Sequence, residues 1–201
     1  MSESLERRHG LEPLLAASGK SRVAQPAVTV RVRGDLGHIN LRGRASDNGL
    51  LKVVEQELGQ ALPVEPNTFS AGEHRVCWLG PDEWLLLTPG AGAADLARRL
   101  DGKLSSGHAA VNDVSGGQVA LMLEGPGCRD LLARGCTLDL HPHVFRVGDC
   151  AQSGLAKANV FIALVDDTPA FMVVVRRSFA DYLCRWLARA GCDQGILITA
   201  S

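Results

Sequence analysis

The sequence lacks a long apolar run and an excess of charge of either sign. No stretch approaches the roughly 20 apolar residues that a membrane-spanning helix needs, and the formal net charge over 201 residues is −1. We therefore expect no nucleic acid and no membrane among its partners. Hydrophobic residues make up 46% of the chain, enough for a substantial core. Without a secretory signal in front, a soluble protein in the cytoplasm is expected.

Sequence motifs for nucleotide binding are also missing. A dinucleotide fingerprint needs close backbone approach at three small residues between a strand and a helix. The segments "GAGAAD" (90–95) and "GPGCRD" (125–130) both place an aspartate at the third of these positions, which would repel the phosphates. Each is expected to be a strand-to-helix turn instead. Neither segment matches a P-loop, and no basic and aromatic ladder suggests nucleic acid.

Cysteine is present but is not arranged as a disulfide framework. The chain is long enough to fold without covalent cross-links, and no secretory signal precedes it. We therefore expect reduced and mostly buried thiols at the six cysteines, Cys77, Cys128, Cys136, Cys150, Cys184 and Cys192.

A metal site is conceivable around His141 and His143, which flank Pro142. Cys136, Asp139 and Cys150 lie nearby in the sequence, and thiolate plus imidazole ligands suit zinc. The spacing matches no recognised zinc motif. A loop with a buried thiol at either end is favoured, and a metal-dependent enzyme is kept as a rival hypothesis.

A nucleophilic triad of His108, Asp113 and Ser115 is disfavoured. Strand alternation directs His108 to the opposite face from the other two side chains. Asp113 and Ser115 are expected to satisfy backbone donors at the "SGG" turn, as short polar side chains often do.

The chain carries an internal repeat after a polar segment, residues 1–25, that we interpret as a tail or docking arm. The order strand, turn, strand, glycine, helix is found in "VTVRVRGDLGHINLRGRASDNGLLKVVEQELG" and again in "AAVNDVSGGQVALMLEGPGCRDLLARGC". Gly43 and Gly125 occupy equivalent places in the two copies. We infer a single domain over residues 26–201, made of two repeats at about 26–105 and 106–201.

Each repeat continues into a hairpin and a second helix. The hairpins are expected within "VCWLGPDEWLLL" and "VFIALVDDTPAFMVVV", and the last helix is expected to begin at Ser178. Ser178 is a good N-cap, with Asp181 in the capping-box position. The predicted fold class is therefore α+β: two pseudo-equivalent ββαββα halves with antiparallel sheets and helices packed on one face.

Two tryptophans and four arginines are candidates for contacts with a partner. Trp78 and Trp84 flank a turn at Pro81, and either belong to the core or face a partner. The arginines lie near junctions of strand and helix, as solvated ends of elements or as interface anchors. The interface candidates are Trp78, Trp84, Arg42, Arg44, Arg176 and Arg177.

Several separated motifs resemble the gamma subunit of heterotetrameric sarcosine oxidase. They are "DLGHINLRG", "RVCWLGPDEWLLL", "NDVSGGQVALMLEGPGCRDLLARGCTLDLHPHVFRVGDC" and "VVVRRSFADYLCRWL", and the likeness covers about residues 28–190. The "DVS…GP…LL" arrangement is more distantly similar to the folate-binding domain of glycine-cleavage aminomethyltransferase. That domain also has the duplicated α+β architecture inferred above.

The resemblance implies a role in a complex that oxidises sarcosine to glycine. The products are hydrogen peroxide and either formaldehyde or 5,10-methylenetetrahydrofolate. The alpha, beta and delta subunits would carry FAD, FMN, NAD, tetrahydrofolate and zinc, and this chain would carry no cofactor, metal or catalytic site. It would then be a non-catalytic assembly subunit. The alternatives are a stand-alone folate-binding one-carbon carrier and a subunit of a related N-methyl amino acid demethylase.

Overall fold

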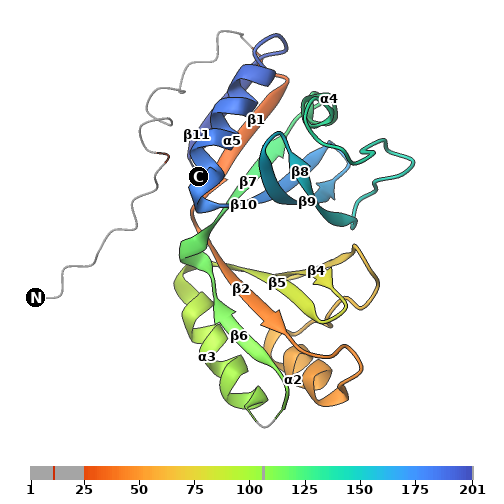
Figure 1. Ribbon diagram of the computed structural model, residues 1–201, viewed down its shortest axis with the longest axis vertical. Helices are drawn as coiled ribbons and strands as arrows, with labels where there is room; N and C mark the ends of the chain where they lie inside the picture. Colours follow the sequence, from red (N-terminus) through yellow and green to blue (C-terminus); the bar gives the residue numbers. More distant parts are fainter. Residues whose placement is uncertain (1–10, 12–24, 106, 201) are drawn as a thin grey trace, which may run out of the picture.

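The computed structural model describes residue 11, residues 25–105 and residues 107–200, and it contains two β-sheets with helices on their outer faces (Figure 1). The tail or docking arm predicted over residues 1–25 lies outside the described residues, apart from Leu11 and Gln25. The six-stranded sheet has the order β11 (Ile196–Ala200), β1 (Val28–Arg33), β7 (Gln118–Glu124), β10 (Ala170–Arg176), β9 (Ala158–Asp166) and β8 (Cys150–Leu155). The five-stranded sheet has the order β3 (Phe69–Ala71), β4 (Arg75–Gly80), β5 (Glu83–Pro89), β2 (Leu36–Arg42) and β6 (Ala110–Asp113).

The predicted α+β fold class with antiparallel sheets is confirmed, with three differences in detail. All neighbouring strands are antiparallel except β1 and β11, which are parallel. The first repeat has one more strand than predicted, β3, and the second has two more, β8 and β11. The repeats also exchange their first strands: β1 pairs with β7 and β11, whereas β6 pairs with β2.

Each sheet is covered on one face by its own helices. In Figure 1, α4 (Cys128–Ala133) and α5 (Arg177–Ala190) lie with the six-stranded sheet in the upper half of the molecule. The lower half holds α2 (Asn48–Leu58) and α3 (Ala93–Leu104) with the five-stranded sheet. Two separate apolar clusters fill these helix-to-sheet contacts. Short 3₁₀ turns, η1 (Gly90–Gly92) and η2 (Ser115–Gly117), precede α3 and β7.

Helix ends follow local signals at α2 but not at α5. Asp47 caps α2 by accepting hydrogen bonds from the backbone of its first turn, and Gly59 ends the helix with a φ of 65°. The prediction that Ser178 caps the last helix is wrong. Strand β10 passes directly into α5, which begins at Arg177 with no side-chain cap, and Asp181 instead pairs with Arg185 at 2.8 Å.

The first hairpin places its two tryptophans opposite each other but buries them unequally. Trp84 has no exposed surface, and its indole N–H donates to the Pro63 carbonyl at 2.8 Å. The interface role predicted for Trp84 is therefore wrong, because a fully buried side chain has no surface to offer a partner. Trp78, its cross-strand neighbour, is half-buried and packs against the same apolar cluster.

The inner faces of the two sheets pack against each other through a third apolar cluster, which we call the inter-sheet layer. Cys77, Leu85 and Leu87 of the five-stranded sheet meet residues of the other sheet that include Phe161 and Met172. His38 also points to this side of β2, since its neighbour Ile39 lies in the cluster beneath the helices. His38 is 2% exposed, and neither ring nitrogen forms a hydrogen bond with a residue that the structure describes.

Replacement of the buried tryptophan should cost far more stability than replacement of its neighbour. We expect Trp84→Ala to lower the free energy of unfolding by about 3–5 kcal/mol, as for other large aromatic side chains in cores. Trp78→Ala should cost less, because part of Trp78 is in solvent. Urea unfolding of both purified variants measures the difference. Equal losses of unfolding free energy would contradict the conclusion that Trp84 is more deeply buried than Trp78.

His38 should make the fold less stable in weak acid. Burial lowers the pKa of His38 to about 4, although the charge of Asp113 acts in the opposite direction. As pH falls from about 6.5 to 4, the unfolded chain binds this proton before the folded chain does, and about 3 kcal/mol is lost. Urea unfolding at a series of pH values should show this loss in the wild type and its reduction in His38→Leu. Parallel pH curves for the two proteins would contradict it.

Candidate functional site

A cleft of about 780 Å³ opens between the two sheets at one end of the inter-sheet layer. This volume lies within the range of small-molecule sites, about 300–1,000 Å³. Its walls come from both sheets and from the connection between β6 and β7. The lining residues used below are Asn40, Arg42, Leu79, Glu83, Leu85, Gln118, Gln152, Asn159, Phe161, Val174 and Arg176.

Two of the predicted arginines, Arg42 and Arg176, meet at this cleft. Arg42 ends β2 and forms an ion pair with Glu83 at 2.7 Å, on the neighbouring strand. The Asn40 side chain donates to the other oxygen of Glu83 at 2.8 Å, which fixes the carboxylate. The Arg42 side chain is still 56% exposed. Such an exposed pair contributes little to stability, so the guanidinium remains available to other groups.

Arg176 provides a second cation on the opposite wall. It is the last residue of β10, it is exposed, and its side chain forms no ion pair or hydrogen bond with a described residue. Its cross-strand neighbour Gln118 has a buried side-chain oxygen that accepts no hydrogen bond from a described residue and would suit a donor. With Glu83 already paired to Arg42, the two arginines favour an acidic ligand.

The floor of the cleft is apolar and its rim is polar. Leu85, Phe161 and Val174 belong to the inter-sheet layer and form the floor. At the rim, the Gln152 side chain donates to the Leu79 carbonyl at 2.9 Å, which links the two sheets. An apolar centre with a polar margin that contains arginine is the usual composition of a protein–protein contact.

The remaining interface candidates lie elsewhere. Arg44 is exposed in the turn between β2 and α2, Arg177 is exposed at the start of α5, and neither Arg44, Arg177 nor Trp78 lines the cleft. Their interface roles stay predictions. Asn40, Glu83 and Gln118 were missed by sequence reasoning, because only the pairing of distant strands brings them to Arg42 and Arg176.

The histidines and cysteines considered for a metal site lie in separate environments. The rings of His141 and His143 stack with their centroids 5.1 Å apart. The Cys136 thiol contacts Ser153, whereas the Cys150 thiol contacts the Thr68 carbonyl. Over residues 25–105 and 107–200, no three His, Cys, Asp or Glu side chains are grouped to hold a metal ion.

The predicted structural role of Asp113 and Ser115 is confirmed. The Ser115 backbone N–H donates to Asp113 at 2.9 Å, and the Ser115 hydroxyl accepts from the His38 backbone at 2.9 Å. These bonds attach the turn before β7 to strand β2. His108 is exposed in the loop before β6.

Both glycine-containing segments are strand-to-helix turns, as predicted. Residues 90–95 join β5 to α3, and residues 125–130 join β7 to α4. Gly125 has a φ of 123°, and a Cβ there would lie 2.4 Å from the Ala27 carbonyl oxygen. The glycine is thus required for close approach to the chain's own backbone.

The cysteine prediction is also confirmed: all six are free, and Cys77, Cys128, Cys150 and Cys184 are buried. Burial raises the pKa of Cys128, Cys150 and Cys184 to about 12, so these thiols stay protonated and unreactive at neutral pH. Among the helices that the structure describes, none is long and apolar enough to cross a membrane.

Known proteins provide a direct comparison with this architecture. The chain is 30% identical over 187 residues to the sarcosine oxidase subunit gamma of Corynebacterium sp. (strain U-96), covering 92% of this chain and 89% of that protein. Its structure is similar to a chain of the heterotetrameric sarcosine oxidase from Corynebacterium sp. U-96, solved in complex with pyrrole 2-carboxylate. That similarity has a TM-score of 0.84 at 28% identity, over 93% of this chain and 95% of that one.

A more distant similarity concerns the fold alone. The glycine cleavage system aminomethyltransferase T from Bartonella henselae matches with a TM-score of 0.67 at 14% identity. That match covers 94% of this chain and 58% of the other. Both resemblances inferred from the sequence motifs are thereby confirmed. Residues 42–193 match the family described as sarcosine oxidase, gamma subunit family, and the chain belongs to that family.

Proposed function

We propose that this chain is a non-catalytic assembly subunit of a heterotetrameric sarcosine oxidase. The observation that carries the proposal is the inter-sheet cleft, where two accessible arginines stand over an apolar floor. A partner segment with an acidic group and an apolar side chain would complement both features. The arginines would orient the segment, and burial of the apolar side chain would supply most of the affinity.

The parent complex, in this proposal, oxidises sarcosine to glycine in the cytoplasm. It produces hydrogen peroxide together with formaldehyde or 5,10-methylenetetrahydrofolate. The alpha, beta and delta subunits carry FAD, FMN, NAD, tetrahydrofolate and zinc, and one large subunit is the main partner of this chain. A related N-methyl amino acid demethylase would need the same assembly role, with a different substrate site on the large subunits.

A folate-binding one-carbon carrier is the alternative function. The cleft volume of about 780 Å³ favours it, because a ligand of folate size could enter. The exposed residues at the rim, Arg42, Gln152 and Asn159, leave the cleft less enclosed than most small-molecule sites. A segment of a large partner suits this open shape better.

Removal of the cleft arginines should weaken assembly without unfolding the chain. We expect Arg42→Ala and Arg176→Ala each to reduce the binding free energy for the other subunits by about 1–4 kcal/mol, as for interface anchors. The measurement is titration of the tagged chain with the remaining subunits. Arg98→Ala, at an exposed position on α3, serves as the matched control. Unchanged affinity in both cleft variants would remove this cleft from the interface.

The purified chain should be inert on its own. We expect no flavin absorbance, no stoichiometric zinc, no tight binding of tetrahydrofolate and no release of hydrogen peroxide from sarcosine. Absorbance spectroscopy, metal analysis, calorimetry and a peroxide assay test these four points. Turnover of sarcosine by the isolated chain would overturn the assembly role, and stoichiometric folate binding would support the alternative.

A further inference from the structure

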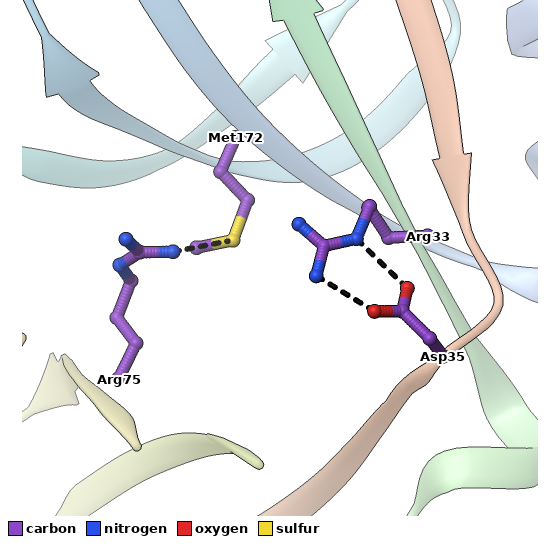
Figure 2. A network of polar contacts seen from close by, with 4 residues as sticks. All are labelled: Arg33, Asp35, Arg75 and Met172. Atoms are coloured by element: carbon purple, nitrogen blue, oxygen red, sulfur yellow. Dashed lines mark hydrogen bonds and ion pairs between the residues drawn. The ribbon is translucent and has the colours of Figure 1, made fainter. Parts of the chain in front are cut away.

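Arg75 is a half-buried cation at the other end of the inter-sheet layer from the cleft. It begins β4, whereas the cleft residue Leu79 lies near the end of the same strand. Its Nε atom is shielded from solvent and has no hydrogen-bond partner within the described part of the chain. The only hydrogen bond that the guanidinium forms with a described residue is to the Met172 sulfur, at 3.6 Å (Figure 2). A thioether is a weak acceptor, so the charge of Arg75 is poorly compensated.

The surroundings of Arg75 hold it in place without neutralising it. Its guanidinium lies over the Phe69 ring, 5.4 Å from the centroid. Glu73, two residues earlier, is exposed, and no carboxylate in the described part of the chain forms an ion pair with Arg75. Burial lowers the pKa of Arg75, and the positive charge of Arg33 acts in the same direction.

The carboxylate of Asp35, which Figure 2 shows in the same view, is bound to Arg33. The Nε and Nη2 groups of Arg33 donate to the two Asp35 oxygens, each at 2.8 Å. This is the two-pronged geometry in which guanidinium groups bind carboxylates most strongly. On Arg75 the same edge, Nε and Nη2, forms no hydrogen bond with a described residue. Arg33 thus demonstrates in this molecule the interaction that Arg75 lacks.

We propose that Arg75 receives a carboxylate side chain from the neighbouring subunit when the complex assembles. This inference rests on the proposed assembly function and assigns a second, separate contact to it. A desolvated cation without an anion is unfavourable, and an acidic partner would remove that cost.

The location of Arg75 favours a polypeptide as the source of the carboxylate. Phe69 belongs to β3, a three-residue strand at the edge of its sheet, and Ala71 at the end of β3 is exposed. A neighbouring protein can approach an edge of this kind, with an aromatic ring and an arginine side by side. Arginine and aromatic residues are the side chains that most often dominate protein–protein binding energy.

The test compares Arg75→Met with wild type in two measurements. The full-length chain is first titrated with the remaining subunits, and we expect the dissociation constant to rise at least about tenfold, since a charge pair is lost. The isolated chain is then unfolded in urea, and we expect an unchanged or higher midpoint, since an uncompensated cation is replaced by an apolar side chain. Arg98→Met is the matched control on an exposed helix position.

Arg75→Lys separates the effect of the positive charge on binding from the effect of the two-pronged guanidinium geometry. It keeps the positive charge but cannot form the two-pronged contact, so its affinity should fall between those of wild type and Arg75→Met. A dissociation constant of Arg75→Met within about twofold of the wild-type value would overturn the inference, because the loss of a charge pair should weaken binding much more than that. A lowered urea midpoint together with weaker binding would also overturn it, because Arg75 would then act within the fold.

Failure of this inference is distinguishable from failure of the proposed function. If the wild-type chain does not bind the other subunits, the assembly role falls and this inference falls with it. If the wild type binds and Arg75→Met binds equally well, the assembly role stands and only the carboxylate contact is rejected.

Discussion

The packing of two sheets against each other is the constraint on which the rest of this molecule depends. The layer between them is an apolar cluster that includes Leu85, Phe161 and Met172. The polar side chains of these inner faces gather at the two ends, with Arg42 and Arg176 at one and Arg75 at the other. Since charges are costly inside such a layer, its open ends are the places where the fold can present cations next to apolar surface. The features that suit a partner are therefore by-products of how the core is built.

The helices pack on the outer faces of the two sheets, so the open ends of the inter-sheet layer remain available for contact with a partner. Helices α2 and α3 cover one sheet and α4 and α5 cover the other, so the outer faces are already satisfied. Two of the polar groups considered for catalysis or metal binding have structural partners: Ser115 binds the His38 backbone, and the Cys150 thiol contacts Thr68. This distribution agrees with membership of a family of subunits. It also explains why the histidine and cysteine motifs were poor guides to a site.

Sequence periodicity predicted the elements far better than it predicted their neighbours. The helix over Asn48–Leu58 and both tight hairpins were predictable, because local spacing and turn residues determine them. The exchange of β1 and β6 was not, since pairing between strands so far apart in the sequence, such as Arg42 with Ala110 or Thr29 with Glu124, leaves no local signal. Trp78 and Trp84 lie on one face and looked equivalent, yet only Trp84 reaches the Pro63 carbonyl. The cleft itself was not predicted: Arg42 and Arg176 were named only as interface candidates, and Glu83 and Gln118 lie beside them through tertiary pairing alone.

The exchanged first strand has a consequence for how the chain is made in the cell. Strand β1 lies between β7 and β11, and among the described strands β1 is the first and β11 the last in the sequence. During synthesis, one edge of β1 therefore stays unpaired until β11 has emerged, since Val28 pairs with Ile196. Such long-range pairing slows folding and leaves an unpaired, aggregation-prone strand edge exposed in the meantime. The order of synthesis thus leaves β1 with one edge uncovered until β11 becomes available to pair with it.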